Sequence, residues 1–105
     1  MIVVDTTVLA YAVGGDHVLR EPCRVILAAA VQLQATTTVE VIQEFTHVCA
    51  RRRPREDAVE YAGRFATVLS PLLVQDGDDL HEGLALFRTS PALGAFDCVL
   101  ALAVS

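Results

Sequence analysis

An otherwise apolar opening segment, MIVVDTTVLAYAV, is interrupted by a single charged residue, Asp5. The β-branched residues 2–4 predict a short buried strand, and residues 6–13 predict a helix that Gly14 and Gly15 end. A buried strand that passes directly into a helix is typical of α/β folds with a parallel sheet. Ligands of such sheets bind beyond the carboxyl ends of the strands, which is where Asp5 is expected.

The rest of the chain continues this alternation of short strands and helices. Further strands are predicted at residues 33–36 and 70–74, and helices at residues 20–31, from 37 to the arginines before Pro54, at 55–68, around Leu80, Leu84 and Phe87, and at 95–104. The chain has the length of one domain. We therefore expect a single α/β domain whose parallel sheet is flanked by helices.

Charge and composition narrow the function classes. The net charge of -5 argues against a protein that holds nucleic acid on a generally basic surface. The chain contains no lysine, which excludes a phosphate-loop NTPase and Schiff-base chemistry. Because 53% of the residues are hydrophobic, we expect large buried faces, and therefore an oligomer or a complex.

The cysteines and the apolar runs indicate the compartment. Cys23, Cys49 and Cys98 are odd in number and lie in apolar or helical sequence, which favours reduced thiols in a core over disulfides. Charged residues break every apolar run before it reaches the roughly 18–20 residues that a membrane span needs. No basic leader precedes the first apolar run. Together these features predict a cytoplasmic protein that does not enter a membrane.

Two acidic residues in the first half of the chain allow both a structural and a functional interpretation. Asp5 either caps the helix that begins at Thr6 or binds a ligand beyond the strand. The segment TTVE fits a capping box with Thr37 as N-cap, which gives Glu40 a structural role. Glu44 lies one turn deeper, beyond the reach of the cap. It is either a solvated surface residue or points along the edge of the sheet toward Asp5.

Asp97 is the only charged residue between Thr89 and Ser105. It is either a first-turn carboxylate favoured by the helix dipole, or a buried acid that needs a cation. Carboxylates that converge without a basic residue between them repel one another, and they stay ionised together around a hard divalent cation such as Mg²⁺ or Mn²⁺. Attack of a metal-activated water on a phosphodiester is the chemistry that such a site favours.

The sequence around these acids resembles the PIN-domain ribonucleases, and within them the VapC toxins of bacterial toxin-antitoxin pairs. MIVVDTTVLAYA resembles the family's opening motif of a hydrophobic strand, Asp, any residue, and Ser or Thr. TTTVEVIQEF resembles the helix with the second acid, and LGAFDCVLALA resembles the segment with the third. The similarity runs in order over essentially the whole chain.

The resemblance implies a role for each matching residue. It makes Asp5, Glu44 and Asp97 the catalytic and metal-binding acids. It makes Thr7 the hydroxyl residue that orients the site, whereas Glu40 matches no acidic position. It also implies a PIN-like three-layer fold, Mg²⁺- or Mn²⁺-dependent endoribonuclease activity that leaves a 3'-hydroxyl, a homodimer, and a VapB-like antitoxin whose C-terminal segment lies across the active site.

One departure from the family pattern concerns the end of the sequence. PIN domains usually continue past the third acid into a fourth strand with a T-x-D acid, then a last helix and strand, whereas this sequence stops at Ser105. We therefore expect residues 1–105 to be a single PIN-like domain that lacks its C-terminal strands. Either a longer protein supplies them, or the toxin ended prematurely. Without them, residues 2–4 would form an exposed apolar edge.

The function predicted from the sequence is therefore a metal-dependent endoribonuclease toxin that hydrolyses RNA and is inhibited by a VapB-like antitoxin. The alternative is a catalytically inactive PIN-like module that binds a partner. A basic cluster, RRRPR at residues 51–55, also allows two interpretations. It is either the solvated end of a helix, where arginines complement the dipole, or a grip on RNA phosphates or on an acidic stretch of antitoxin.

Overall fold

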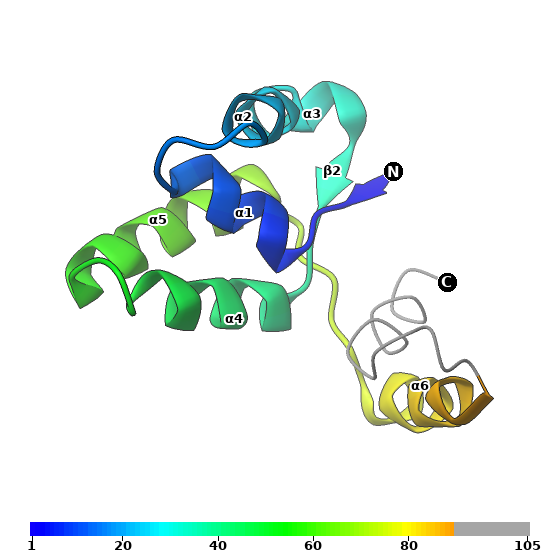
Figure 1. Cartoon of the computed structure of the whole chain (residues 1–105). Coiled ribbons are helices and arrows are strands. Elements are labelled where there is room, and N and C mark those ends of the chain that lie inside the picture. Colours follow the sequence, from blue (N-terminus) through cyan, green and yellow to red (C-terminus); the bar gives the residue numbers. More distant parts are fainter. Residues whose placement is uncertain (90–105) are drawn as a thin grey trace. The chain divides into compact units, whose positions relative to one another are not determined.

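A computed structural model describes residues 1–89 of the protein. The chain divides into two compact units, Met1–Leu72 and a second unit that begins at Leu73. The first unit contains, in order, β1 (Ile2–Val3), α1 (Thr6–Val13), α2 (Arg20–Ala28), α3 (Ala30–Leu33), β2 (Ala35–Thr36), α4 (Val39–Cys49) and α5 (Arg55–Val68) (Figure 1). The described part of the second unit contains α6 (Gly77–Thr89).

The sheet of the first unit consists of β1 and β2, which run parallel with Ile2 beside Ala35 and Val3 beside Thr36. Parallel neighbours need a crossover connection, and α1, α2 and α3 provide it. The second strand begins later than predicted because Gln34 adopts the left-handed conformation, with φ 51° and ψ 47°, and ends α3. The predicted α/β class with a parallel sheet is confirmed.

The single helix predicted at residues 20–31 is wrong, because the chain forms two helices there. Ala29 separates α2 from α3 with φ -96° and ψ 18°, outside the helical region. Its N–H still donates to the carbonyl oxygen of Val25 at 3.1 Å, so the break leaves no unpaired donor. Neither glycine nor proline lies between residues 23 and 53, so no residue that usually ends a helix marks this position.

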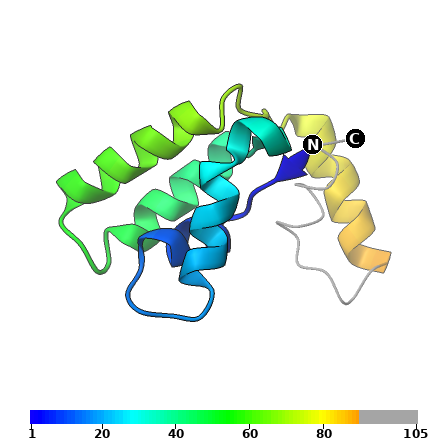
Figure 2. The ribbon, with the colours of Figure 1, turned by 90° about the horizontal axis from the view of Figure 1, so that it is seen from above.

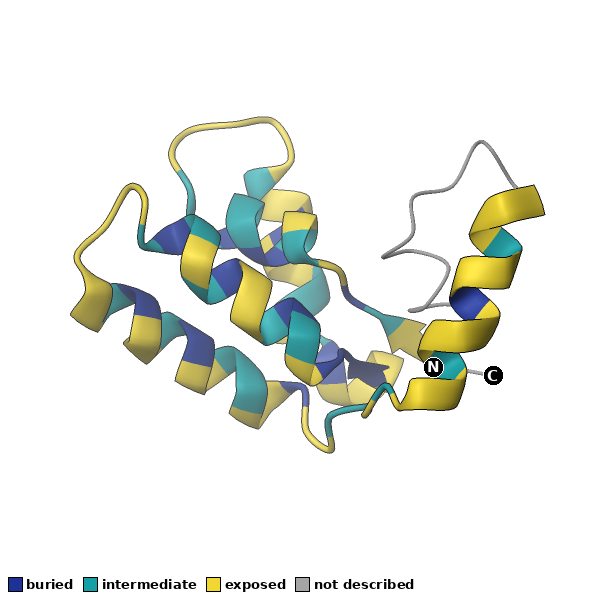
Figure 3. Ribbon diagram, turned by 90° about the horizontal axis from the view of Figure 1, so that it is seen from below, coloured by how far each residue is buried: buried dark blue, intermediate teal, exposed yellow. Residues whose placement is uncertain are grey.

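The hydrophobic core of the first unit lies where its helices meet. In the first unit α1 packs against both α2 and α4, and α5 packs against α4 (Figures 1 and 2). Figure 3 shows buried residues alternating with exposed ones along the helices, and on α4 they recur at helical spacing. The largest buried apolar side chains are Val4, Leu9, Val41, Phe45 and Leu69. Phe45 of α4 meets Phe65 of α5 edge to face, with 5.2 Å between the ring centroids, so this pair joins the two helices.

The strand predicted at residues 70–74 is reduced to an isolated β-bridge at Leu73, and no full strand lies between α5 and α6. A side chain of β2 holds the start of this segment instead. The Thr36 hydroxyl lies 3.0 Å from the carbonyl oxygen of Leu69 and 2.9 Å from that of Pro71, and it donates to them. Pro71 has no N–H to give to a strand ladder, which limits how far a strand can extend here.

Three further expectations can be compared with the described residues. The helix predicted around Leu80, Leu84 and Phe87 is confirmed as α6. Cys23 and Cys49 are free and buried, in agreement with reduced core thiols. No helix among residues 1–89 combines the length and the apolar character that crossing a membrane requires. The predicted helix at residues 95–104 and Cys98 lie outside the described residues.

Candidate active site

Asp5 stands at the carboxyl end of β1, and the residue before it is fixed on both sides. The N–H of Val4 donates to the carbonyl oxygen of Thr36 at 2.8 Å, and the carbonyl oxygen of Val4 accepts from the Thr37 hydroxyl at 2.5 Å. Val4 is buried, whereas Asp5 is exposed. The sheet therefore sets the point at which Asp5 leaves the core.

The Asp5 carboxylate caps α1, as one of its two interpretations predicted. Its Oδ1 accepts a hydrogen bond from the N–H of Val8 at 3.2 Å. This bond satisfies one of the free donors in the first turn of the helix. A carboxylate has a second oxygen with its own lone pairs, and the cap does not use Oδ2. The structural role therefore leaves Asp5 with an oxygen for a ligand.

Glu44 comes to the same end of the sheet from α4. Its Oε2 accepts a hydrogen bond from the Thr6 hydroxyl at 3.0 Å, although the two residues are 38 positions apart in sequence. Thr6 is the residue directly after Asp5 and the first residue of α1. Glu44 is exposed, and its carboxylate points toward the start of α1, so it is a surface residue that contacts the residue next to Asp5. Its predicted role as a metal ligand stays a prediction.

The hydroxyl that contacts Glu44 belongs to Thr6, which the sequence analysis did not single out. Thr7, the predicted orienting residue, is exposed beside it and lines the same cleft. Among residues 1–89, no hydrogen bond of the Thr7 side chain shows which group it would orient. Its predicted role therefore stays a prediction. The sequence could not distinguish the two threonines, because the choice depends on how α1 is rotated against α4.

The predicted capping box at the start of α4 is wrong by one residue. The N-cap is Thr38, whose hydroxyl accepts from the N–H of Val41 at 3.1 Å. The side chain of Thr37 is instead directed to β1, where its hydroxyl donates to the carbonyl oxygen of Val4. Glu40 still lies in the first turn of α4, where a negative charge is favourable. Its expected structural role at this helix end therefore needs no capping box.

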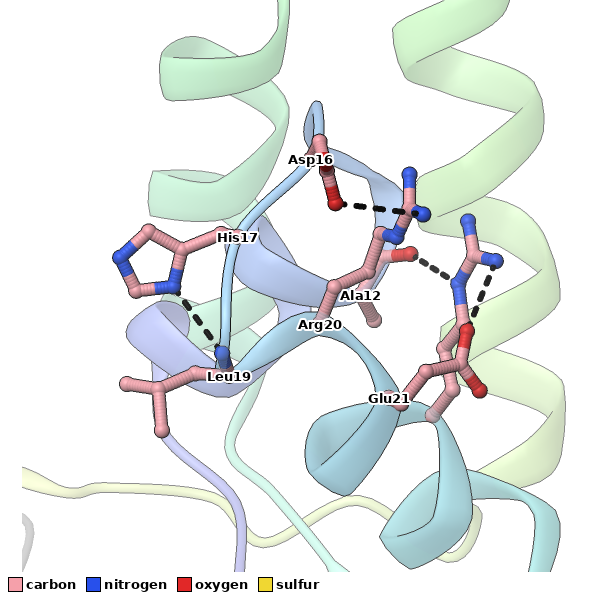
Figure 4. A network of polar contacts seen from close by, with 7 residues as sticks. Ala12, Asp16, His17, Leu19, Arg20 and Glu21 are labelled. Atoms are coloured by element: carbon pink, nitrogen blue, oxygen red, sulfur yellow. Dashed lines mark hydrogen bonds and ion pairs between the residues drawn. The ribbon is translucent and has the colours of Figure 1, made fainter.

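Neither site carboxylate is neutralised by a basic side chain of the described chain. The ion pairs among residues 1–89 join neighbours in sequence, namely Arg20 with Asp16, Arg24 with Glu21 and Arg64 with Glu60. Figure 4 shows the first two around the start of α2. Asp5 and Glu44 therefore keep their negative charge available for a cation. Their oxygen donors suit a hard divalent ion such as Mg²⁺ or Mn²⁺.

The charge of Asp5 also reaches a buried thiol on α2. Burial raises the pKa of Cys23 above its usual value, and the negative charge of Asp5 raises this pKa further. Cys23 therefore stays a neutral thiol in the core beneath this end of α1.

Asp97, the third predicted acid, lies outside the described residues. Within residues 1–89 no three acidic, histidine or cysteine side chains come together in a way that could hold a metal ion. Two of the three predicted acids, Asp5 and Glu44, are thus placed at one end of the sheet. The contribution of Asp97 stays a prediction.

A cleft of about 580 Å³ extends from Glu44 between α1 and α4. Thr6, Thr7 and Glu44 line one end, and Arg52 and Arg53 line the other. The Arg53 guanidinium donates to the carbonyl oxygen of Val13, the last residue of α1, at 2.7 Å. Since Thr6 at the start of α1 meets Glu44, the two helices run in the same direction along the cleft.

Comparison with known proteins finds one matching family and several similar ribonucleases. The model of the PIN domain family matches residues 2–104. Ribonuclease VapC7 of Mycobacterium tuberculosis (strain ATCC 25618 / H37Rv) is 50% identical over 108 residues, which cover 96% of this chain and 72% of the relative. Ribonuclease VapC23, from the CDC 1551 / Oshkosh and H37Rv strains of the same species, is 35% identical over 101 residues, covering 92% of this chain and 78% of the relative. No solved structure matches the chain significantly.

Proposed function

The chain belongs to the PIN-domain family and, within it, to the VapC ribonucleases, and from this membership we propose that it hydrolyses RNA with a divalent metal ion. Asp5, Glu44 and Asp97 would hold the ion. When bound, Mg²⁺ or Mn²⁺ supplies charge neutralisation at the phosphodiester and lowers the pKa of an attacking water. The proposed protein is a toxin, with endonucleolytic action on RNA.

The observation that carries this proposal is the hydrogen bond from Thr6 to Glu44. It brings a carboxylate from α4 to the residue next to Asp5. The same bond fixes one oxygen of Glu44 in direction, while the cap on α1 fixes one oxygen of Asp5. Each acid is therefore oriented by the fold before any ligand binds, which reduces the ordering required when one does.

The proposal extends to partners and compartment. We expect a VapB-like antitoxin whose C-terminal segment covers the site, a homodimer, and a cytoplasmic location. Exposed apolar side chains of the first unit, such as Val18, Val25 and Val31, offer surface for such contacts. The family match from residue 2 to residue 104 supports a single PIN-like domain.

RNA cleavage by the full chain tests the proposed function. We expect cleavage in Mg²⁺ or Mn²⁺, its loss when EDTA removes the metal, and its loss in Asp5→Asn in the presence of metal. Asp5→Asn keeps an oxygen that can cap α1, so circular dichroism should show an intact fold. Equal cleavage in all these arms would refute the metal mechanism. An intact protein that never cleaves RNA but binds its antitoxin would support the inactive partner-binding module instead.

A further inference from the structure

The arginines at the far end of the cleft differ in how they are engaged. Arg51 lies 3.3 Å from the Nε2 of His47, and Arg53 is held by the carbonyl oxygen of Val13 and lies over the ring of Tyr61 at 5.4 Å. These contacts tie both guanidinium groups to the protein. They also leave fewer of their donors for an external ligand.

Arg52 is in a different situation. It lines the cleft and is exposed, and its guanidinium makes no hydrogen bond or ion pair with any residue that the structure describes. Arg55 is likewise exposed and unengaged in this range, but it does not line the cleft. A free guanidinium presents a planar set of donors that matches the two oxygens of a phosphate. Arg52 is therefore the cation of the cleft that is available to a ligand.

An aromatic pair lines the same cleft from α1 and the loop after it. The rings of Tyr11 and His17 are stacked, with centroids 4.5 Å apart and an angle of 29° between their planes. The Nδ1 of His17 accepts from the N–H of Leu19 at 3.0 Å, which fixes the ring, and Figure 4 shows it turned away from the ion pair of Asp16 and Arg20. An exposed, fixed aromatic ring is a surface on which a nucleobase can stack.

We propose that this cleft binds the single-stranded RNA that flanks the cleaved phosphodiester, with Arg52 on a backbone phosphate and the stack of Tyr11 and His17 facing a base. The inference rests on the proposed ribonuclease function and adds the path of the substrate. The cleft is continuous from Glu44 to Arg52. An RNA strand whose cleaved phosphate lies beside Glu44 must extend away from it. The path along the cleft toward Arg52 offers both a cation and a stacking surface.

The charges along the cleft favour RNA over an acidic peptide as its occupant. Besides Glu44, the acid that lines the cleft is Asp16, and its carboxylate is already paired with Arg20 at 3.8 Å. A divalent ion would neutralise the Glu44 end and could itself contact a phosphate, and Arg52 offers a cation at the other end. Phosphates repeat regularly along a strand, so one strand can meet both the ion and Arg52.

Binding of a short unstructured fluorescein-labelled RNA tests the assignment of Arg52. The titration uses the full chain in Mg²⁺, with Glu44→Gln in every protein so that the probe is not cut. We expect Arg52→Gln to weaken binding about 10- to 100-fold, because a charge-assisted bond to phosphate is lost. The slope of log affinity against log salt should also fall by about 0.7, the contribution of one phosphate contact to a single strand.

Arg55→Gln is the matched control, because it removes the same charge from the same cluster outside the cleft. It should leave both affinity and salt slope unchanged. If Arg52→Gln and Arg55→Gln lost the same RNA affinity, the effect would come from the overall charge of the protein, and the proposal would be overturned. Unchanged RNA binding by Arg52→Gln would also overturn it, even if that variant bound the antitoxin less well. Absence of RNA cleavage by the unmodified chain would refute the ribonuclease function separately.

A second substitution tests the stacking surface. His17→Ala should weaken binding of the same RNA at least about fivefold, since stacking of one base on an aromatic ring is typically worth this much or more. Its salt slope should stay unchanged, because no phosphate contact is removed. An unaltered affinity in His17→Ala would remove the aromatic pair from the proposed path.

Discussion

Glu44→Gln should reduce the single-turnover rate of RNA cleavage at least about 100-fold, while the protein stays folded. Glutamine keeps the shape of the side chain and an oxygen that can accept from the Thr6 hydroxyl, so the contact between α1 and α4 is retained. What is lost is the negative charge that would hold a divalent ion. A loss of this size corresponds to nearly 3 kcal/mol of transition-state free energy, roughly the contribution expected of one group that stabilises developing charge.

Glu40→Gln is the matched control for this substitution. It removes the same charge from the same helix one turn earlier, at a position in the first turn of α4. We expect its cleavage rate to stay near that of the unmodified protein. If Glu40→Gln abolished cleavage and Glu44→Gln did not, the second acid of the site would be Glu40, and the interpretation of the Thr6 contact would be wrong.

Phe45→Ala should lower the free energy of unfolding by about 3–5 kcal/mol. Phe45 is fully buried and joins α4 to α5 through its contact with Phe65, so alanine would leave a cavity at the centre of the first unit. Small domains are stable by only about 5–15 kcal/mol in total, so this variant should be largely unfolded at moderate urea. The chain contains no tryptophan, and far-UV circular dichroism is therefore the suitable measurement.

Val59→Ala on α5 is the control for the core substitution. Val59 is 63% exposed, and its truncation should change stability by no more than about 0.5 kcal/mol. A loss below about 1 kcal/mol in Phe45→Ala would show that the side chain is not enclosed as described. Phe45 also lines the cleft beside Glu44, so a destabilised core should lower RNA cleavage as the protein unfolds.

The position of Asp5 could be predicted from sequence because it depends on local structure. A β-branched run, an acid and a helix start follow one another directly, and the carboxyl end of a parallel strand is where α/β proteins bind ligands. The direction of Glu44 could not be predicted in this way. Helical spacing placed it beyond the cap, but only the packing of α4 against α1 decides that this exposed carboxylate meets Thr6.

The N-cap of α4 was predicted one residue too early, at Thr37, for a physical reason that cannot be read from the sequence. Thr36, Thr37 and Thr38 are consecutive, and each can cap a helix by residue type. Tertiary bonds distribute them: Thr36 donates to Leu69 and Pro71, Thr37 donates to Val4, and Thr38 remains for the cap. The capping preference was correct for the segment, and the assignment within it depended on contacts with β1 and the chain after α5.

The secondary-structure errors likewise come from tertiary contacts. No residue type marks the break at Ala29, and an apolar segment at residues 70–74 resembles a strand whether or not a partner strand lies beside it. Where hydrophobic period and end signals agreed, as for α1 and α5, the predicted bounds match the observed helices.

Isothermal titration calorimetry of Mn²⁺ binding to the full chain tests most directly whether Asp5 and Glu44 belong to one metal site. The account predicts that the unmodified protein binds Mn²⁺, and that Asp5→Asn and Glu44→Gln each weaken this binding at least about tenfold, with Glu40→Gln unchanged. Equal Mn²⁺ affinity in all four proteins, or no binding by the unmodified protein, would contradict it.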